Sequence, residues 1–261
     1  MNRTKNIVLY FAFFFLLQLV AMALVTGVGM VMGKPATTDM DGQQLLLIEL
    51  LFTLMVIAWF LGRKWTPVSG NWLKTRPLGV LAWTVIGSLG VLLPSMWLEE
   101  HLTFLPDIAG NDIMKLIGER GGIFVVSVLV PLSEEIVFRG AILRSLLDDQ
   151  SERTGRWTAI TISALVFAVA HMNPAQMPHA FLIGLLLGWL YERTRSIVPG
   201  IVLHVVNNGA CCLLARLYVN NPDITLTELF GSSERALLAS VFGLLIFLPA
   251  VYQLHLRMKK A

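Results

Sequence analysis

Two glutamates and an arginine stand inside a stretch of the chain that is otherwise apolar. Glu134, Glu135 and Arg139 lie between the apolar runs at residues 123–130 and 140–143. A charged side chain at the depth of the bilayer is costly, so such residues are rare in spanning segments and usually serve a function. Carboxylates in this position could act as a general base or acid, and the arginine could balance their charge.

The two glutamates are predicted to have different roles. On a helix, Glu135 and Arg139 are four residues apart, share a face and can form an ion pair that lowers the cost of both charges. Glu134 is rotated by about 100° around the helix and has no cation at an equivalent spacing. We therefore expect Glu134 to be the chemical residue, with Glu135 and Arg139 as a structural brace. The alternative is a buried ion network that only fixes the register of the helix.

Two later apolar segments carry polar side chains at helical spacing. His171 follows Phe167 by four residues, so the ring and the imidazole share a helix face. His204 and Asn208 are also four residues apart, and an imidazole with an amide donor could stabilise a developing oxyanion. Alternatively, His171 is an interface residue, and His204 with Asn208 is a hydrogen-bonding contact between helices. With the glutamates, these side chains are the material of a hydrolytic site.

The composition is that of an integral membrane protein. Hydrophobic residues make up 56% of the chain and charged residues 14%, whereas soluble domains carry about a quarter charged residues. The mean hydropathy is +0.70. The net charge of +3 is spread over connecting segments, which argues for orientation in a lipid bilayer and against nucleic-acid binding. Cys211 and Cys212 are adjacent, which poorly suits a disulfide or a zinc motif, so we interpret them as packing residues.

Eight apolar segments are long enough, or nearly so, to cross about 30 Å of hydrocarbon. The first is interpreted as a retained anchor rather than a signal peptide, because its apolar run continues to Met32. A short surface helix is expected within residues 99–121. No repeat or linker divides the chain, so residues 1–261 are predicted to form a single all-α membrane domain with eight spans. The spans are predicted near residues 7–32, 45–62, 78–98, 122–146, 157–172, 179–194, 198–218 and 236–256.

The basic residues predict the orientation of these spans. With the N-terminus inside, 14 of the 20 Lys and Arg residues fall on one side of the membrane, as the positive-inside rule favours for an even number of spans. Both termini are therefore expected in the cytoplasm, and the protein in the plasma membrane if the host is bacterial. His171 would then lie near the exterior and His204 nearer the cytoplasm. They meet only if the fifth span begins outside the hydrocarbon or the turn at residues 196–200 dips inward.

The three motifs together resemble the CPBP family, the CAAX proteases and bacteriocin-processing enzymes also called the Abi family of intramembrane proteases. The matching elements are Glu134-Glu135-x-x-x-Arg139, Phe167-x-x-x-His171 and His204-x-x-x-Asn208, in the family's order, within a core at residues 120–215. The resemblance implies an eight-span bundle with an internal, water-filled catalytic cavity. It also implies hydrolysis of a peptide bond in a membrane-associated or CAAX-like substrate. Glu134 would activate a water with help from His171, and His204 and Asn208 would stabilise the oxyanion.

The resemblance leaves the cofactor and two competing functions open. The family is traditionally grouped with the metalloproteases, and Glu134, His171 and His204 could hold zinc with one open position. A metal-free glutamate mechanism uses the same residues. A non-catalytic immunity or scaffold protein of the same fold is one alternative function. A proton-coupled transporter is another, although the chain shows no two-fold repeat. Glu49, near an interface, and His179, at the start of a span, are given little functional weight.

Overall fold

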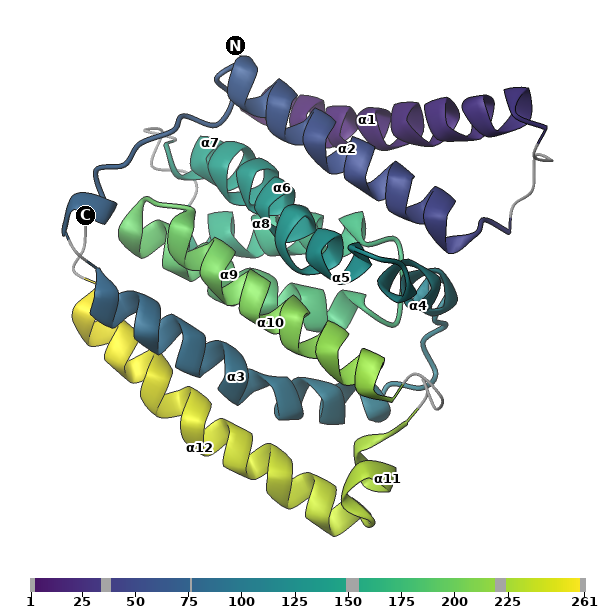
Figure 1. Cartoon of the computed structure of the whole chain (residues 1–261). Coiled ribbons are helices and arrows are strands. Elements are labelled where there is room, and N and C mark those ends of the chain that lie inside the picture. The colour runs from purple at the N-terminus through teal and green to yellow at the C-terminus, as the bar shows by residue number, and fades with distance from the viewer. Residues whose placement is uncertain (1–2, 34–38, 76, 149–154, 219–223, 259–261) are drawn as a thin grey trace.

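The computed structural model describes residues 3–33, 39–75, 77–148, 155–218 and 224–258 (Figure 1). No strand occurs within these ranges, so the predicted all-α class is confirmed for the described chain. Five of the basic residues on which the predicted orientation depends lie outside these ranges, namely Lys34, Arg76, Arg153, Lys259 and Lys260.

Helices occupy the positions that the apolar segments predicted. The predicted fourth segment is one continuous helical path from α5 (Gly122–Phe124) to α7 (Arg144–Leu147). It is π-helical on both sides of Glu134, in η2 (Val125–Leu129) and η3 (Glu135–Leu143). Widened turns of this kind are frequent at functional sites. In chain order the elements are α1 (Arg3–Val31), α2 (Gly42–Gly62), η1 (Leu73–Thr75), α3 (Leu78–Glu100), α4 (Gly110–Gly118), α5 (Gly122–Phe124), η2 (Val125–Leu129), α6 (Val130–Glu134), η3 (Glu135–Leu143), α7 (Arg144–Leu147), α8 (Arg156–Ala170), α9 (Met177–Thr194), α10 (Val198–Leu217), α11 (Leu226–Phe230) and α12 (Ser233–Arg257).

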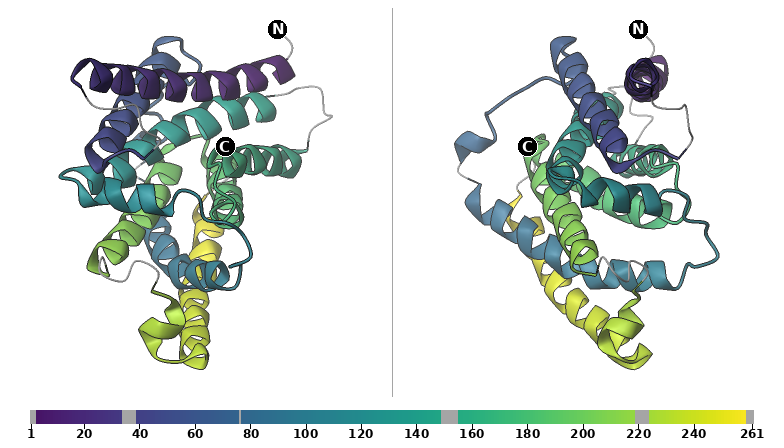
Figure 2. Two further views of the ribbon diagram at one scale, coloured as in Figure 1. Left: turned by 90° about the vertical axis from the view of Figure 1, so that its right-hand side faces the viewer. Right: turned by 45° about the vertical axis from the view of Figure 1, so that its right-hand side comes forward.

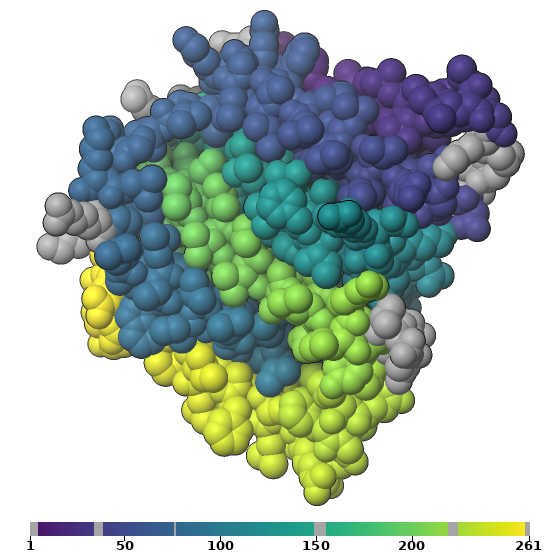
Figure 3. All heavy atoms as spheres, viewed as in Figure 1, coloured from purple at the N-terminus to yellow at the C-terminus, as the bar shows by residue number. Residues whose placement is uncertain are grey.

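Two helix pairs enclose a central group of helices. The α1–α2 hairpin lies on one side and the α3–α12 pair on the other, with the α5–α7 path, α8, α9 and α10 between them (Figure 1). Figure 2 shows the same separation from two further directions, with α1 and α2 at one end and α11 and α12 at the other. In the space-filling view, the central helices reach the surface between α2 and α3 (Figure 3). All three motifs lie on the central helices.

Among the described residues, five helices are long and apolar enough to cross a membrane by length and composition. They are α2, α3, α10, α12 and the part of α1 from Lys5 to Val31. Helix α8 has only 15 residues, about 22 Å at 1.5 Å per residue, which is shorter than the hydrocarbon layer. The membrane character is therefore supported, whereas the count of eight spans stays a prediction.

Small residues let α8 and α9 pack closely. A Cβ added to Gly184 would lie 3.1 Å from Ala164, and one added to Gly188 would lie 2.9 Å from Ile160. The G-x-x-x-G sequence of α9 thus serves packing within the bundle. This close approach holds α8, and with it Phe167, against α9.

The predicted surface helix within residues 99–121 is present as α4, which packs against α2, α5 and α10. Its Leu116 and Ile117 are buried. On its outer side, Lys115 Nζ donates a hydrogen bond of 2.5 Å to Asp39 Oδ1 and one of 3.2 Å to the Met40 carbonyl. The hydrogen bond to Asp39 raises the pKa of Lys115 above its usual 10.5. These bonds tie α4 to the segment that leads into α2.

Candidate active site

His204 lies between the two glutamates of the first motif. Its Nδ1 is 3.3 Å from Oε1 of Glu135, and its Nε2 is 3.5 Å from Oε2 of Glu134. Because a carboxylate oxygen accepts, Nδ1–H donates to Glu135 and leaves Nε2 facing Glu134. The first and third motifs therefore meet in one cluster, and the histidine has one defined orientation.

Glu135 and Arg139 form the buried ion pair that their spacing predicted. Arg139 Nη1 donates to Glu135 Oε1 over 2.9 Å, and both side chains are 0% exposed. Arg139 Nη2 donates to the Gly184 carbonyl on α9 over 3.1 Å. A Cβ on Gly200 would lie only 2.5 Å from Glu135 Oε2, so the first turn of α10 needs a glycine there. The brace thus connects η3 with α9 and α10.

Phe167 is the common contact of all three motifs. The guanidinium carbon of Arg139 lies 4.4 Å from the centre of its ring, close enough for a cation–π contact. The same ring makes edge contacts with His171, at 4.8 Å between ring centroids, and with His204, at 5.7 Å. Both histidines therefore reach one site, although the sequence placed them at different depths.

His171 caps the C-terminus of α8, where its ring is oriented by the backbone. Its Nδ1 is 3.0 Å from the Phe167 carbonyl, which can only accept, so Nδ1 carries the proton and Nε2 is free to accept. The next residue, Met172, has the left-handed φ of 50° that turns the chain away from the helix. Asn173 then fixes the turn, because its Nδ2 donates to Asp107 and its Oδ1 accepts from the Ile108 amide.

A cavity of about 430 Å³ opens beside these residues. Glu134, His171 and Asn208 line it, and Asn208 Nδ2 makes a long hydrogen bond of 3.4 Å to the Val126 carbonyl. His204 is 3% exposed and lies behind Glu134 rather than on the cavity wall. The four predicted catalytic residues are thus in one place, three at the surface of the cavity and one supporting it.

The side chains do not have the arrangement of a metal centre. In the part of the chain that the structure describes, no group of three or more His, Cys, Asp and Glu side chains could hold a metal ion. Both ring nitrogens of His204 face carboxylates, and Nδ1 of His171 is used by the Phe167 carbonyl. The predicted set of Glu134, His171 and His204 therefore does not fit a zinc ion in this arrangement.

Four residues of the site were missed or given little weight in the sequence. Glu49 and Glu99 both line the cavity, as do His179 and Asn207. Helical spacing could have found Asn207, since it lies one turn from His204 and next to Asn208. Glu49, Glu99 and His179 come from helices whose approach to the cavity only the tertiary structure shows.

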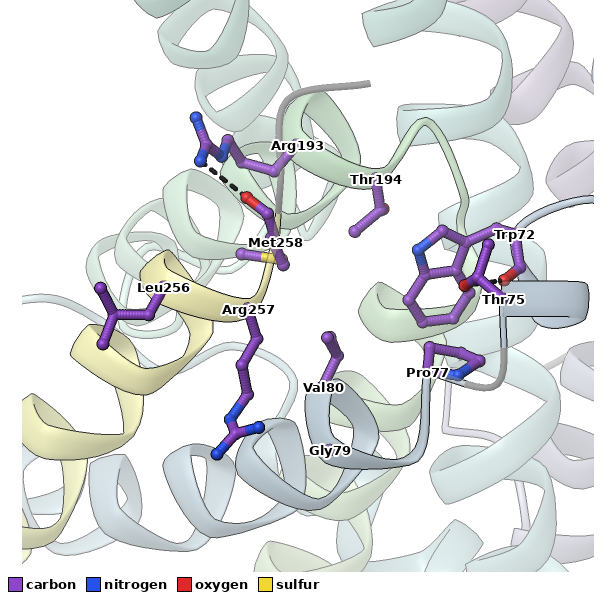
Figure 4. Close-up of a pocket in the computed structure, with 10 residues that line it drawn as sticks. All are labelled: Trp72, Thr75, Pro77, Gly79, Val80, Arg193, Thr194, Leu256, Arg257 and Met258. Carbon is purple, nitrogen blue, oxygen red and sulfur yellow. Dashed lines mark hydrogen bonds between the residues drawn. The ribbon is translucent and has the colours of Figure 1, made fainter.

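A second cavity, of about 660 Å³, lies away from the motifs, between the ends of α3, α9 and α12 (Figure 4). Arg193 and Arg257 lie on one side of it and Trp72 and Thr75 on the other. Arg193 Nη2 donates to the Met258 carbonyl over 2.7 Å. None of the predicted site residues lines this cavity.

The comparison with known proteins agrees with the motifs. Residues 118–210 match the family model described as type II CAAX prenyl endopeptidase Rce1-like. The chain is 35% identical over 152 residues to the membrane-embedded CAAX protease MroQ of Staphylococcus aureus, a match that covers 55% of this chain and 60% of that protein. It is 23% identical over 161 residues to the UPF0177 protein YxdF of Lactococcus lactis, covering 59% of this chain and 85% of that protein. No solved structure matches.

The match to the family model covers the whole motif region, from Glu134 to Asn208. The resemblance that the three motifs predicted is confirmed, since the segment that carries the candidate site is similar to the CAAX protease family.

Proposed function

We propose that the protein is an intramembrane endopeptidase that hydrolyses a peptide bond with a water activated by Glu134. The observation that carries the proposal is the position of Glu134. Its carboxylate lines a cavity shared with His171 and Asn208, and it lies 3.5 Å from Nε2 of His204. A base, a second proton acceptor and an amide donor thus face one space large enough for a peptide segment.

In the proposed reaction, Glu134 takes a proton from water while the water oxygen attacks the carbonyl carbon of the substrate. His171 assists through Nε2, which is free to accept a hydrogen bond from the same water. The carbon–nitrogen bond then breaks, and Glu134 returns its proton to the leaving amine. The second proton of the water stays on the new carboxyl group and passes to the amine, so the products are a carboxylate and an ammonium group, and Glu134 is again ready for the next water.

The oxyanion that forms in this reaction would be stabilised by Asn208 and His204. Asn208 Nδ2 is on the cavity wall, and its long hydrogen bond to the Val126 carbonyl can be exchanged for a shorter one to an oxyanion. His204 is held by Glu135, so that its Nε2 stays directed toward Glu134. When Nε2 carries a proton, it would become the second donor once Glu134 moves toward the bound water and leaves Nε2 open to the oxyanion. Arg139 and Glu135 keep this arrangement in place and do not react.

The proposed substrate is a peptide or membrane protein that reaches the cavity from the bilayer. We further propose that the chain spans the membrane eight times with both termini in the cytoplasm. Glu99 at the end of α3 and His179 at the start of α9 would then place the open part of the cavity toward the exterior.

The experiment that tests this function compares protein termini in membranes of cells that produce the wild type or Glu134→Gln. New C-termini that appear with the wild type and vanish with Glu134→Gln would identify substrates, which are then cleaved as synthetic peptides by the purified protein. Glu100→Gln is the control, since Glu100 accepts a hydrogen bond from Thr227 and does not line the cavity. Cleavage of a confirmed substrate by Glu134→Gln at the wild-type rate would overturn the proposal.

A further inference from the structure

The cavity has a second polar group that the proposed chemistry does not use. Glu99 of α3, His179 of α9 and Asn207 of α10 all line it. The Asn207 Nδ2 is 3.4 Å from His179 Nε2, and His179 Nδ1 is 3.8 Å from Glu99 Oε1. Three helices thus contribute to one polar wall, beside the part of the cavity that holds Glu134.

This wall presents a buried acceptor that has no donor. Asn207 is 3% exposed, and its Oδ1 is buried with no hydrogen-bond partner among the described residues. Its Nδ2 donates to His179 Nε2, so the remaining proton of that ring is on Nδ1, on the side of Glu99. A buried acceptor that lacks a donor is costly, and a ligand that donates to it removes the cost. The side chain of Glu99, 43% exposed, stands at the open part of the same wall.

The charge of the cavity points to the same kind of ligand. Glu49, Glu99 and Glu134 all line it, and none of the described residues that line it is a lysine or an arginine. Arg139 is fully buried and turned to Glu135 and the Gly184 carbonyl, so it does not reach the cavity. A free C-terminal carboxylate would find no cation to pair with among the described lining residues. A cationic group would find complementary charge and several hydrogen-bond acceptors.

We propose that Glu99 and Asn207 form a subsite for a lysine or arginine side chain of the substrate near the cleaved bond. This inference rests on the proposed peptidase function and specifies its substrate class. The charged head group would donate to Asn207 Oδ1 and to the Glu99 carboxylate, while the aliphatic stem would lie along apolar lining residues such as Leu92 and Met96. The cleaved bond is then internal to an apolar segment that carries one basic residue, and not at a free C-terminus.

The test measures binding, which does not depend on turnover. Fluorescent apolar peptides of about 20 residues carry a single lysine at successive positions, or norleucine or glutamate at the same positions. They are titrated against the Glu134→Gln protein in lipid nanodiscs. At the best position we expect the lysine peptide to bind about tenfold more tightly than the norleucine peptide, and the glutamate peptide to bind most weakly. Equal affinity of the lysine and norleucine peptides at every position overturns the inference.

Matched variants identify the residues responsible. Glu99→Gln should reduce the preference for lysine to about twofold or less, whereas Glu100→Gln, one residue later on the same helix, should leave it unchanged. Asn207→Leu removes the buried acceptor and should also weaken the binding of the lysine peptide. Glu99→Lys should reverse the preference in favour of the glutamate peptide, which a variant that is merely misfolded cannot do. Equal effects of Glu99→Gln and Glu100→Gln would contradict the subsite.

The outcome also separates this inference from the proposed function. A preference for lysine in Glu134→Gln nanodiscs, together with no cleavage of the same peptides by the wild type, would support the subsite and count against the peptidase. Cleavage without any preference for a basic residue would support the peptidase and overturn the subsite.

Discussion

The guanidinium carbon of Arg139 lies 4.4 Å from the centre of the Phe167 ring, and this contact joins the first two motifs. Glu135, the ion-pair partner of Arg139, accepts a hydrogen bond from His204 of the third motif. Arg139, which does not react, thus positions both segments that carry a histidine, α8 directly and α10 through Glu135. This explains why an arginine and a phenylalanine belong to the candidate site although neither faces the cavity.

The first prediction concerns the buried ion pair. Glu135→Gln leaves Arg139 without its counter-ion in a fully buried position, so we expect the free energy of unfolding to fall by about 3–5 kcal/mol. The measurement is unfolding in mixed micelles followed by trapping of the unfolded state.

Glu134→Gln is the control for that loss, because Glu134 faces the cavity and has no arginine partner. It should change stability by much less than Glu135→Gln while it abolishes turnover. A larger loss of stability in Glu134→Gln than in Glu135→Gln would reverse the roles assigned to the two glutamates.

The second prediction concerns topology. Reporter fusions after residues 40, 110 and 225 should report the exterior, and fusions after residues 70, 150 and 260 the cytoplasm, because the basic residues favour that orientation. Two or more fusions with the opposite location would rule out the eight-span arrangement.

The third prediction concerns metal. Because the described carboxylates and imidazoles form no three-ligand set, we expect hydrolysis of a confirmed substrate to continue after exhaustive chelation. Elemental analysis of the purified protein accompanies the assay. Stoichiometric zinc that is lost in both His171→Ala and His204→Ala would show that the ligands rearrange around an ion.

Much of the helical scaffold could be predicted from the sequence, because apolar runs report helices in a membrane protein directly. The ion pair of Glu135 and Arg139 was predictable for a similar reason, since helical spacing alone brings the two side chains together. The same reasoning placed Phe167 and His171 on one face, as the structure confirms.

Contacts between helices could not be read from spacing within one helix. The distance between His204 and Glu135 depends on how α10 crosses η3, and Gly200 permits that crossing only because it lacks a Cβ. The shortness of α8 and the shared contact with Phe167 bring His171 and His204 together, despite their different positions along the predicted spans. Asn207 was overlooked and His179 was given little weight because the contact between them joins two different helices.

The fourth prediction uses two glycines of α10. An alanine at position 200 would put its Cβ 2.5 Å from Glu135 Oε2, whereas the nearest atom to a Cβ at position 209 is Ser127 Cβ at an ordinary 3.7 Å. Alanine favours a helix over glycine, so Gly209→Ala should be neutral or slightly stabilising. Gly200→Ala should displace Glu135 from His204 and reduce kcat.

Thermal unfolding and kinetics of the two glycine variants are measured together on the same substrate. Equal behaviour of Gly200→Ala and Gly209→Ala would mean that the position of Glu135 against His204 does not matter for turnover.

The last prediction concerns the donors for the oxyanion. Asn208→Ala removes the amide that lines the cavity beside Glu134, so we expect kcat to fall by about two to three orders of magnitude with a smaller change in KM. His171→Ala should reduce kcat comparably, since it removes the second acceptor for the attacking water. The two residues act in one step, so the double variant should lose much less than the product of the two single effects. Single-turnover kinetics on a confirmed substrate provide the measurement. If Asn208→Ala and His204→Ala both leave kcat unchanged, neither side chain stabilises the oxyanion, and Glu134 must work with donors supplied by the backbone or the substrate.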